Sequence, residues 1–176
     1  VNTSASTGTA STGWKTISLS GISGVVSEFG VVGSGTTYLG TSGGQIYKVE
    51  DVTAATPVVS NISPSGLSGY VSGIGVNEEN ADELLAVVSN YSVKCSYHTK
   101  DGGANWTHVS GNLEENTDGS GSGPSVRTAR ILGDGRLYLV GTSVGRFTTQ
   151  DLDGDDTSWE QEDIDQLGAV VVDHIV

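Results

Sequence analysis

The chain has 176 residues, of which 26 are glycine and 16% are charged, and its formal net charge is −13. This length is sufficient for one domain with a sizeable core. So acidic a surface repels nucleic-acid backbones and anionic lipid, and no apolar run approaches the roughly 20 residues of a membrane helix, so we expect neither nucleic-acid binding nor membrane insertion.

The chain opens with a Ser/Thr/Gly-rich stretch, residues 1–13, that is typical of a linker. After it, apolar residues come in short bursts rich in Val, Ile and Tyr, separated by Gly, Ser, Asn and Asp. This pattern indicates strands and turns. Residues 80–83 have the spacing of a helix capping box but run directly into a strand-like apolar segment, so we expect a loop there.

An internal repeat indicates the fold. Tyr47, Tyr97 and Phe147 are spaced 50 residues apart, and each follows a strand-like run and precedes an aspartate by four residues. A period of about 40 to 50 residues with four short strands is typical of one β-propeller blade. The sequence therefore predicts an all-β fold, a partial β-propeller of about three four-stranded antiparallel blades with flanking strands of adjacent blades.

In chain order, the predicted blades span about 25–61, 70–110 and 126–162, within a propeller segment of 14–176. Their predicted strands are 25–32, 36–41, 45–49, 57–61, 70–76, 84–89, 94–99, 105–110, 126–132, 136–142, 145–149 and 158–162. Residues 14–18 resemble the outer strand of a preceding blade, and residues 169–176 the inner strand of a following one. The first strand of each blade is nearly all apolar, as expected for a strand buried on both faces.

Three blades and two extra strands do not close a ring, so two apolar blade faces would be left bare. We therefore expect other polypeptide to complete the ring, either the rest of the same propeller or neighbouring subunits. The chain starts at Val1 and contains no methionine, which favours a processed or excised piece of a longer protein.

The clearest local motif is Thr99-Lys-Asp-Gly-Gly-Ala-Asn-Trp-Thr107. Asp-Gly between two strand-like runs is a strong hairpin signal, because the turn needs positive φ angles that glycine adopts without a clash. The carboxylate of Asp101 can accept backbone N–H groups two or three residues on, and Trp106 offers a large apolar plate to the neighbouring blade. We expect Asp101, Gly103 and Trp106 to join the third and fourth strands of the second blade.

This motif resembles the Asp box, or bacterial neuraminidase repeat, Ser/Thr-x-Asp-x-Gly-x-x-Trp, of sialidases, xyloglucanase-type hydrolases, sortilin-like receptors and photosystem assembly propellers. The likeness is strongest to propeller segments of large secreted or surface proteins exported by type IX secretion in Bacteroidetes-type bacteria. The resemblance implies an extracellular or cell-surface location, and a structural role for the box at the blade periphery. The first blade departs from the pattern by keeping only Asp51, and the third by an expanded turn that ends in Trp159.

An acidic turn in the third blade offers a candidate metal site. The acids Asp151, Asp153 and Asp155, with Glu162 further on, match positions 1, 3, 5 and 12 of a calcium loop. The sixth position should be glycine and is Asp156, and no flanking helices are evident. The sequence leaves two interpretations open, a calcium site and a solvated turn.

Other residues carry weaker signals. Cys95 is the only cysteine, so no internal disulfide can form, and its strand-like surroundings predict a small buried hydrophobe. His98 and His108 lie on the two strands of one hairpin and could be neighbours, but a zinc site lacks a third ligand. Asp173, beside His174, could be a carboxylate of the central pore.

Sialidases bind a substrate carboxylate with three arginines and use a Tyr–Glu nucleophile pair. Here the arginines of the propeller region all fall in the third blade and its entry: Arg127, Arg130, Arg136 and Arg146. We therefore assign no catalytic residue and no cofactor other than the candidate calcium. The expected function is a non-catalytic interaction or scaffold module of a secreted or cell-surface bacterial protein, binding glycan or extracellular protein. Two alternatives remain: a fragment of a propeller glycoside hydrolase or sialidase, and a structural component of an extracellular assembly.

Overall fold

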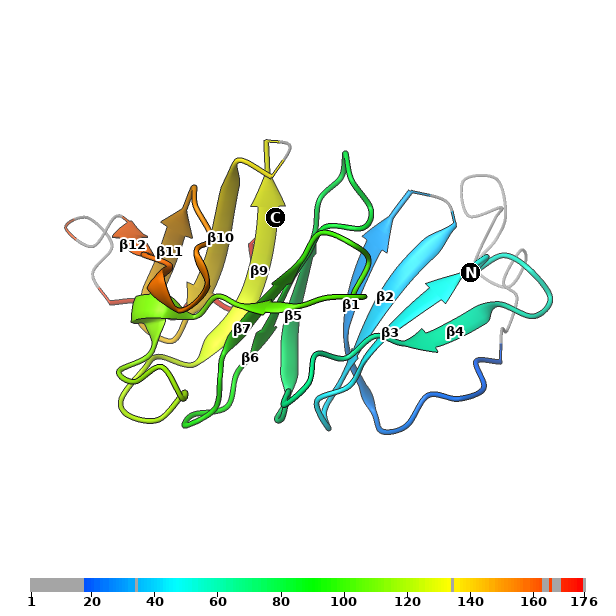
Figure 1. Cartoon of the computed structure of the whole chain (residues 1–176), viewed down its shortest axis with the longest axis horizontal. Helices are drawn as coiled ribbons and strands as arrows, with labels where there is room; N and C mark the ends of the chain where they lie inside the picture. The colour runs from blue at the N-terminus through cyan, green and yellow to red at the C-terminus, as the bar shows by residue number, and fades with distance from the viewer. Residues whose placement is uncertain (1–17, 34, 134, 163–164, 166–168, 176) are drawn as a thin grey trace.

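The structure is a computed structural model, and the residues that it describes are 18–33, 35–133, 135–162, 165 and 169–175. These residues form twelve strands in three sheets, which lie side by side in an arc (Figure 1). Two 3-10 helices, η1 (Gly111–Leu113) and η2 (Gly154–Asp156), accompany the strands. The predicted all-β fold class is confirmed. Among the described residues, no helix is long and apolar enough to cross a membrane.

Each sheet is a four-stranded antiparallel meander whose strands follow chain order, as in a propeller blade. Blade one contains β1 (Val26–Val32), β2 (Thr36–Thr41), β3 (Ile46–Glu50) and β4 (Val58–Asn61). Blade two contains β5 (Val71–Val76), β6 (Leu84–Val88), β7 (Ser96–Thr99) and β8 (Thr107–His108). Blade three contains β9 (Val126–Leu132), β10 (Leu137–Thr142), β11 (Gly145–Thr149) and β12 (Glu160–Glu162).

The repeated aromatics Tyr47, Tyr97 and Phe147 lie on β3, β7 and β11, the third strand of each blade. The outermost strands are shorter than expected: β8 has two residues where 105–110 were predicted. Two causes shorten β8. The residues before it belong to the hairpin turn, and Ser110 after it begins the chain's turn into η1.

The first strands of the blades, β1, β5 and β9, are neighbours around the inside of the arc. Glycines permit their close approach. A Cβ atom at Gly30 would lie 2.8 Å from a methyl carbon of Val76 and 2.9 Å from one of Ile74, so blade two packs directly on this backbone. The backbone at Gly40 has the same relationship to Val71.

The described C-terminal segment, residues 169–175, continues this series. Val172 donates its N–H to the carbonyl of Thr142 at 2.9 Å and contacts Gly141, 31 residues before it, just as Val71 contacts Gly40. The segment therefore occupies the position of a following inner strand, as predicted. The prediction of a strand there was wrong, because residues 169–175 are not hydrogen-bonded to a second strand in a β-ladder. The predicted linker at 1–13 and all but Ser18 of the predicted strand at 14–18 lie outside the described residues.

The opposite end of the arc has a bare apolar face. Ile74 and Val76 of β5 are 6% and 8% exposed, whereas the side chains at the corresponding places of β1, Phe29 and Val31, are 61% and 69% exposed. Beside them lies a hollow of about 520 Å³, lined by Leu19, Phe29, Val31, Gly33, Thr36, Thr37, Leu39, Val49, Val52 and Thr53. The exposed apolar face agrees with the expectation that a further blade belongs there.

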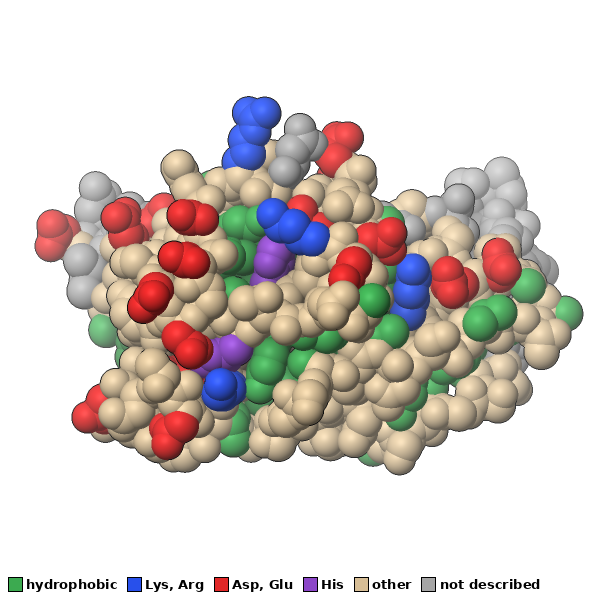
Figure 2. Space-filling view, in the orientation of Figure 1, with side chains coloured by type: hydrophobic (Ala, Val, Ile, Leu, Met, Phe, Trp, Pro, Cys, Tyr) green, Lys and Arg blue, Asp and Glu red, His purple; other side chains and the backbone are tan. Residues whose placement is uncertain are grey.

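Charged side chains lie at both ends of the blades. We call the end where β1, β5 and β9 begin the entry end, and the end where they finish the exit end. The exit-end loops expose both acids and bases: Asp51, Glu78, Glu79, Asp82, Asp101 and Asp151, with Lys100 and Arg136. Glu115 and Asp118, on the connector after β8, are exposed at the entry end. Figure 2 shows acidic side chains over the upper part of the view, with basic side chains among them, and further acidic side chains at the lower left.

Candidate functional site

The hairpin between β7 and β8 has the expected compact turn. The carboxylate of Asp101 accepts the N–H of Asn105 at 2.8 Å and its side-chain amide at 2.7 Å, four residues on instead of two or three. The hydroxyl of Thr99 donates to Asp101 at 2.8 Å and accepts the N–H of Gly103 at 3.1 Å. Gly102 and Gly103 have φ angles of 69° and 92°, which explains why glycine occupies both positions.

These hydrogen bonds stabilise the ionised form of the Asp101 carboxylate. The bonds from the side chain and backbone of Asn105, followed by the one from Thr99, lower the pKa of Asp101 to about 2. The carboxylate is thus ionised throughout the physiological range and fully engaged in holding its own turn.

Tryptophan indoles join successive blades. The indole N–H of Trp106 donates to the carbonyl of Ile62, beyond the end of β4, at 2.7 Å. In blade three, Trp159 repeats this contact by donating to the carbonyl of Val109 of blade two at 3.0 Å. The motif around Trp106 therefore links two blades as well as two strands.

The degenerate copies of the motif lack the carboxylate-centred turn. Asp51 has a φ angle of 53° and accepts the N–H of Ala54 through its backbone carbonyl. In blade three, Thr149 donates to the backbone carbonyl of Asp151 at 2.9 Å, and the turn then widens into η2.

A buried polar cluster lies between blades two and three. Glu83, just before β6, is only 4% exposed. Its carboxylate receives the hydroxyl of Tyr138 at 2.8 Å, contacts the His98 ring at 3.0 Å and accepts the amide of Asn77 at 2.7 Å. Burial opposes the charge of Glu83, but the hydrogen bonds from Asn77, Tyr138 and His98 lower its pKa overall.

The Tyr138–Glu83 pair has the residue types of a sialidase nucleophile, but its environment does not suit a nucleophile. Burial first, and then the bond to ionised Glu83, raise the pKa of Tyr138, so the phenol stays protonated. Both side chains are buried, and substrate has no access to the hydroxyl. This pair holds two blades together.

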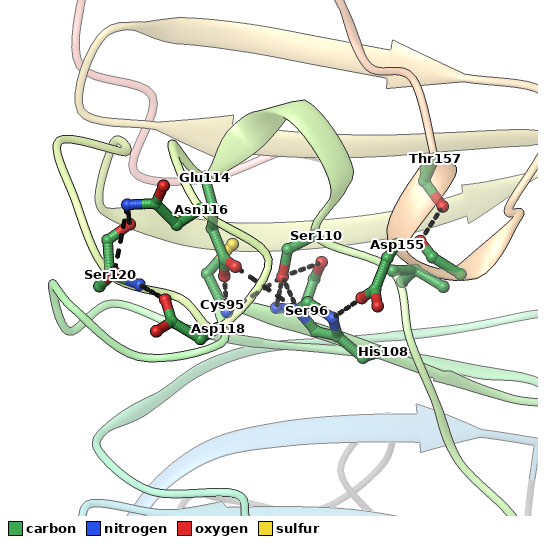
Figure 3. Close-up of polar contacts among 12 residues, drawn as sticks. Cys95, Ser96, His108, Ser110, Glu114, Asn116, Asp118, Ser120, Asp155 and Thr157 are labelled. Carbon is green, nitrogen blue, oxygen red and sulfur yellow. Dashed lines mark hydrogen bonds and ion pairs between the residues drawn. The ribbon is translucent and has the colours of Figure 1, made fainter.

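A second cluster combines a serine, a histidine and an aspartate (Figure 3). The ring of His108, on β8, lies 2.6 Å from the hydroxyl of Ser110 through Nε2 and 2.6 Å from the carboxylate of Asp155, in η2, through Nδ1. Nε2 also lies 3.6 Å from Glu114. Burial disfavours the imidazolium, but the carboxylates of Glu114 and Asp155 raise the pKa of His108.

This constellation is closed to substrate. Ser110 is 0% exposed, and its hydroxyl already accepts the N–H groups of Cys95 at 3.1 Å and Ser96 at 3.0 Å. A serine nucleophile needs a free path to a substrate carbonyl, which Ser110 lacks. The cluster instead ties β7, β8 and the connector after β8 to η2 of blade three.

Cys95 is buried, as predicted, and burial raises the pKa of its thiol. The two histidines of the hairpin turn away from each other. His108 pairs with Tyr97 across the strands, so His98, the next residue on β7, faces the opposite side of the sheet. The suggestion that they are neighbours was wrong, because successive strand residues alternate between faces.

The acidic turn of blade three does not assemble its four carboxylates. Asp155 contacts His108 at 2.6 Å, while Glu162 accepts from Arg146 at 2.5 Å and from Thr148 at 2.8 Å. Within the described ranges, no group of three or more His, Cys, Asp or Glu side chains is placed to hold a metal ion. The engagement of Asp155 and Glu162 elsewhere favours the solvated turn, and calcium binding by Asp151, Asp153, Asp155 and Glu162 stays a prediction.

The inner strand β1 and the C-terminal segment 169–175 carry the remaining candidates for chemistry. Asp173, the suggested pore carboxylate, forms an ion pair with Arg127 of β9 at 2.7 Å. Glu28 of β1, which the sequence did not single out, is half-buried, and this burial raises its pKa. The only sequence sign for Glu28 was a charged residue within a mostly apolar inner strand.

Comparison with known proteins supports the fold. No protein-family model and no curated relative matches the sequence. Among solved structures, the GH74 enzyme of Niastella koreensis is similar, with a TM-score of 0.54 and 20% identity over 71% of this chain. The chain spans only 22% of that enzyme's chain. The computationally designed Ika4 protein matches 83% of each chain with a TM-score of 0.51 and 10% identity.

Proposed function

We propose that this chain is a non-catalytic interaction module of a secreted or cell-surface bacterial protein. Its blades form a rigid scaffold that presents loops to a glycan or to an extracellular protein. The Asp-box resemblance of residues 99–107 and the structural likeness to a GH74 enzyme, a propeller-type glycoside hydrolase, support the extracellular setting.

One observation carries the proposal: the two clusters that contain catalytic residue types are both buried and inaccessible to substrate. Glu83 and Tyr138 are buried between blades, and Ser110 has no exposed surface. Each cluster bonds residues of one blade to residues of the next. Residues of these types are therefore used for cohesion, and a rigid scaffold with exposed loops is suited to binding.

Two parallel measurements on the purified chain test the proposal. Binding is measured on a glycan array that includes xyloglucan and cello-oligosaccharides, and turnover is measured as release of reducing sugar from the same glycans. We expect retention on at least one glycan class without sugar release. Sugar release that disappears in an Asp173→Asn variant would contradict the proposal.

The alternative function is a piece of a propeller glycoside hydrolase. Glu28 and Asp173 favour it, because both lie on inner segments of the arc, and glycosidases need two placed carboxylates. Asp173 forms an ion pair with Arg127, and burial raises the pKa of Glu28, which is the direction that a general acid requires. Glycan cleavage lost in both Glu28→Gln and Asp173→Asn would support this alternative.

A further inference from the structure

A cavity of about 350 Å³ lies at the junction between blades one and two. This volume falls at the lower end of the range of small-ligand sites, which begins at about 300 Å³. The connector after β4 lines one side of the cavity, and blade two lines the other. The residues that matter for recognition are Ser63, Pro64 and Ser65 of the connector, and Tyr97, Asn105 and Trp106 of blade two.

The repeat places an equivalent junction between blades two and three. Ile62 and Val109 correspond to each other, because each accepts a tryptophan indole and donates its N–H to the third strand of its own blade. Three residues further along the chain, Ser65 therefore corresponds to Asn112. The second junction thus shows what can fill the place that is open in the first.

Asn112 closes the second junction with three hydrogen bonds. Its side-chain oxygen accepts the N–H of Trp159 at 2.7 Å, and its side-chain amide donates to the carbonyl of Trp159 at 3.0 Å. Its own N–H donates to the carbonyl of Thr157 at 3.3 Å. Trp159 is only 2% exposed as a result, whereas Trp106 is only partly buried.

The same backbone groups of Trp106 are open. The N–H of Val109 bonds to Ser96 of β7 at 3.1 Å. Since successive residues of an antiparallel strand direct these groups to opposite sides, Trp106 directs its N–H and C=O away from β7. No described residue forms a hydrogen bond with either group. Because Ser65 and Trp106 both line the cavity, the cavity occupies the place that Asn112 takes in the next junction.

The sequence explains why only one junction is closed. Gly111 has a φ angle of 48°, and its backbone lies so close to the carbonyl of Thr157 that a Cβ atom has no room. Pro64 stands at the corresponding position of the first junction, and its ring fixes φ at about −65°. The connector after β4 therefore cannot follow the path that brings Asn112 onto Trp159.

We propose that this cavity binds the carboxamide side chain of an asparagine or glutamine from a segment of an extracellular protein. The amide oxygen accepts the N–H of Trp106, and the amide nitrogen donates to its carbonyl, as Asn112 does for Trp159. A carboxylate lacks the donor. The acetamido groups of glycans are secondary trans amides, whose N–H points away from their C=O, so one such group does not make both bonds. This inference rests on the proposed interaction role and names its partner class.

NMR titration of the isotope-labelled chain tests the proposal. The probe is the capped tripeptide Gly-Asn-Leu, the sequence of residues 111–113, with a methylated C-terminal amide so that asparagine carries its only primary amide. We expect the probe to shift the backbone N–H signal of Trp106 at concentrations up to about 20 mM, where dissociation constants in the millimolar range are measurable. The N–H of Trp159 is the internal control, because Asn112 already bonds to it, and its signal should stay in place.

Matched peptides separate a carboxamide from other ligands. Peptides with aspartate or serine in place of asparagine should bind at least about tenfold more weakly, since each leaves a backbone group of Trp106 unpaired. Equal shifts by all three peptides, or no Trp106 shift by Gly-Asn-Leu, would overturn the proposal. Stronger binding of the aspartate peptide would assign the cavity to an anion held by Lys94, which also lines it, and contradict the proposal. Retention on the glycan array without any peptide effect would overturn this inference and leave the proposed function standing.

Two variants exchange the junctions. Pro64→Gly/Ser65→Asn copies the closed connector into the open junction and should abolish the Trp106 shift. Asn112→Ser opens the closed junction, and the probe should then shift Trp159 as well. If the double variant melts at a lower temperature than the native chain, Asn112→Ser provides the converse test, because it leaves the first junction untouched. An unchanged Trp106 shift in a folded double variant, or an unresponsive Trp159 in Asn112→Ser, would contradict the proposal.

Discussion

The indole N–H of Trp106 donates to the carbonyl oxygen of Ile62 at 2.7 Å and so bonds blade two to blade one. The Trp106→Phe variant keeps most of the apolar contact but leaves this carbonyl without its donor. We expect a loss of about 1 to 3 kcal/mol in the free energy of unfolding, measured by urea denaturation.

Trp159→Phe is a second test of this role, because Trp159 makes the equivalent bond to the carbonyl of Val109 at 3.0 Å. Both variants should lose stability. A neutral Trp106→Phe substitution would show that the indole serves only as an apolar plate.

Tyr138→Phe tests the buried carboxylate between blades two and three. Tyr138 donates to ionised Glu83 at 2.8 Å, whereas Tyr38, a buried tyrosine on β2 of blade one, donates across a blade boundary to the neutral carbonyl of Ala81 at 2.9 Å. Hydrogen bonds to charged groups contribute about 1.5 to 3 kcal/mol, roughly twice those to neutral groups. Thermal unfolding should therefore show a larger loss for Tyr138→Phe than for Tyr38→Phe, and equal losses would contradict an ionised Glu83.

The two buried histidines should titrate in opposite directions from the ordinary value of 6.5. The carboxylates of Glu114 and Asp155 raise the pKa of His108, although burial opposes them. Burial lowers the pKa of His98, although the bond to Glu83 opposes it. NMR titration of the imidazole signals measures both, and the account is contradicted if His98 titrates at higher pH than His108.

The sign of each stability effect follows from linkage. The raised pKa of His108 contributes stability that is fully present below pH 6.5 and is lost as pH rises through its folded-state value. A His108→Ala variant should therefore lose more stability at pH 5.5 to 6 than at about pH 9. The lowered pKa of His98 acts in the opposite sense, because the folded state resists its protonation as pH falls below 6.5.

Calcium provides a further test at the acidic turn. Asp155 is engaged by His108, and Glu162 by Arg146 and Thr148, so millimolar Ca²⁺ should leave the melting temperature unchanged relative to EDTA. A rise in melting temperature that disappears in Asp153→Asn would show that the carboxylates regroup around the ion.

The features that were predictable from the sequence are those that depend on local chemistry or on the repeat period. The 50-residue spacing of Tyr47, Tyr97 and Phe147 located the third strand of each blade. The Asp-Gly pair predicted the turn at Asp101, because all its hydrogen-bond partners lie within a few residues.

Contacts between blades were beyond the reach of the sequence. Glu83 and Tyr138 are 55 residues apart, and His108 and Asp155 are 47 apart. The two residues of each pair lie on different blades and meet only because the blades pack together. No local sequence pattern therefore relates them. The strand alternation that separates His98 from His108 could have been read from the hairpin register, but this register depends on the turn length.

The central claim is that successive blades pack through their inner strands, with blade two lying on the backbone of β1. The most direct measurement is NOE spectroscopy on methyl-labelled protein, between the methyl groups of Ile74 and Val76 and the α-protons of Gly30. The account predicts strong cross-peaks from both side chains, because a Cβ at Gly30 would lie within 3 Å of each. Absence of both cross-peaks, in a spectrum that retains the β1–β2 contacts within blade one, would contradict it.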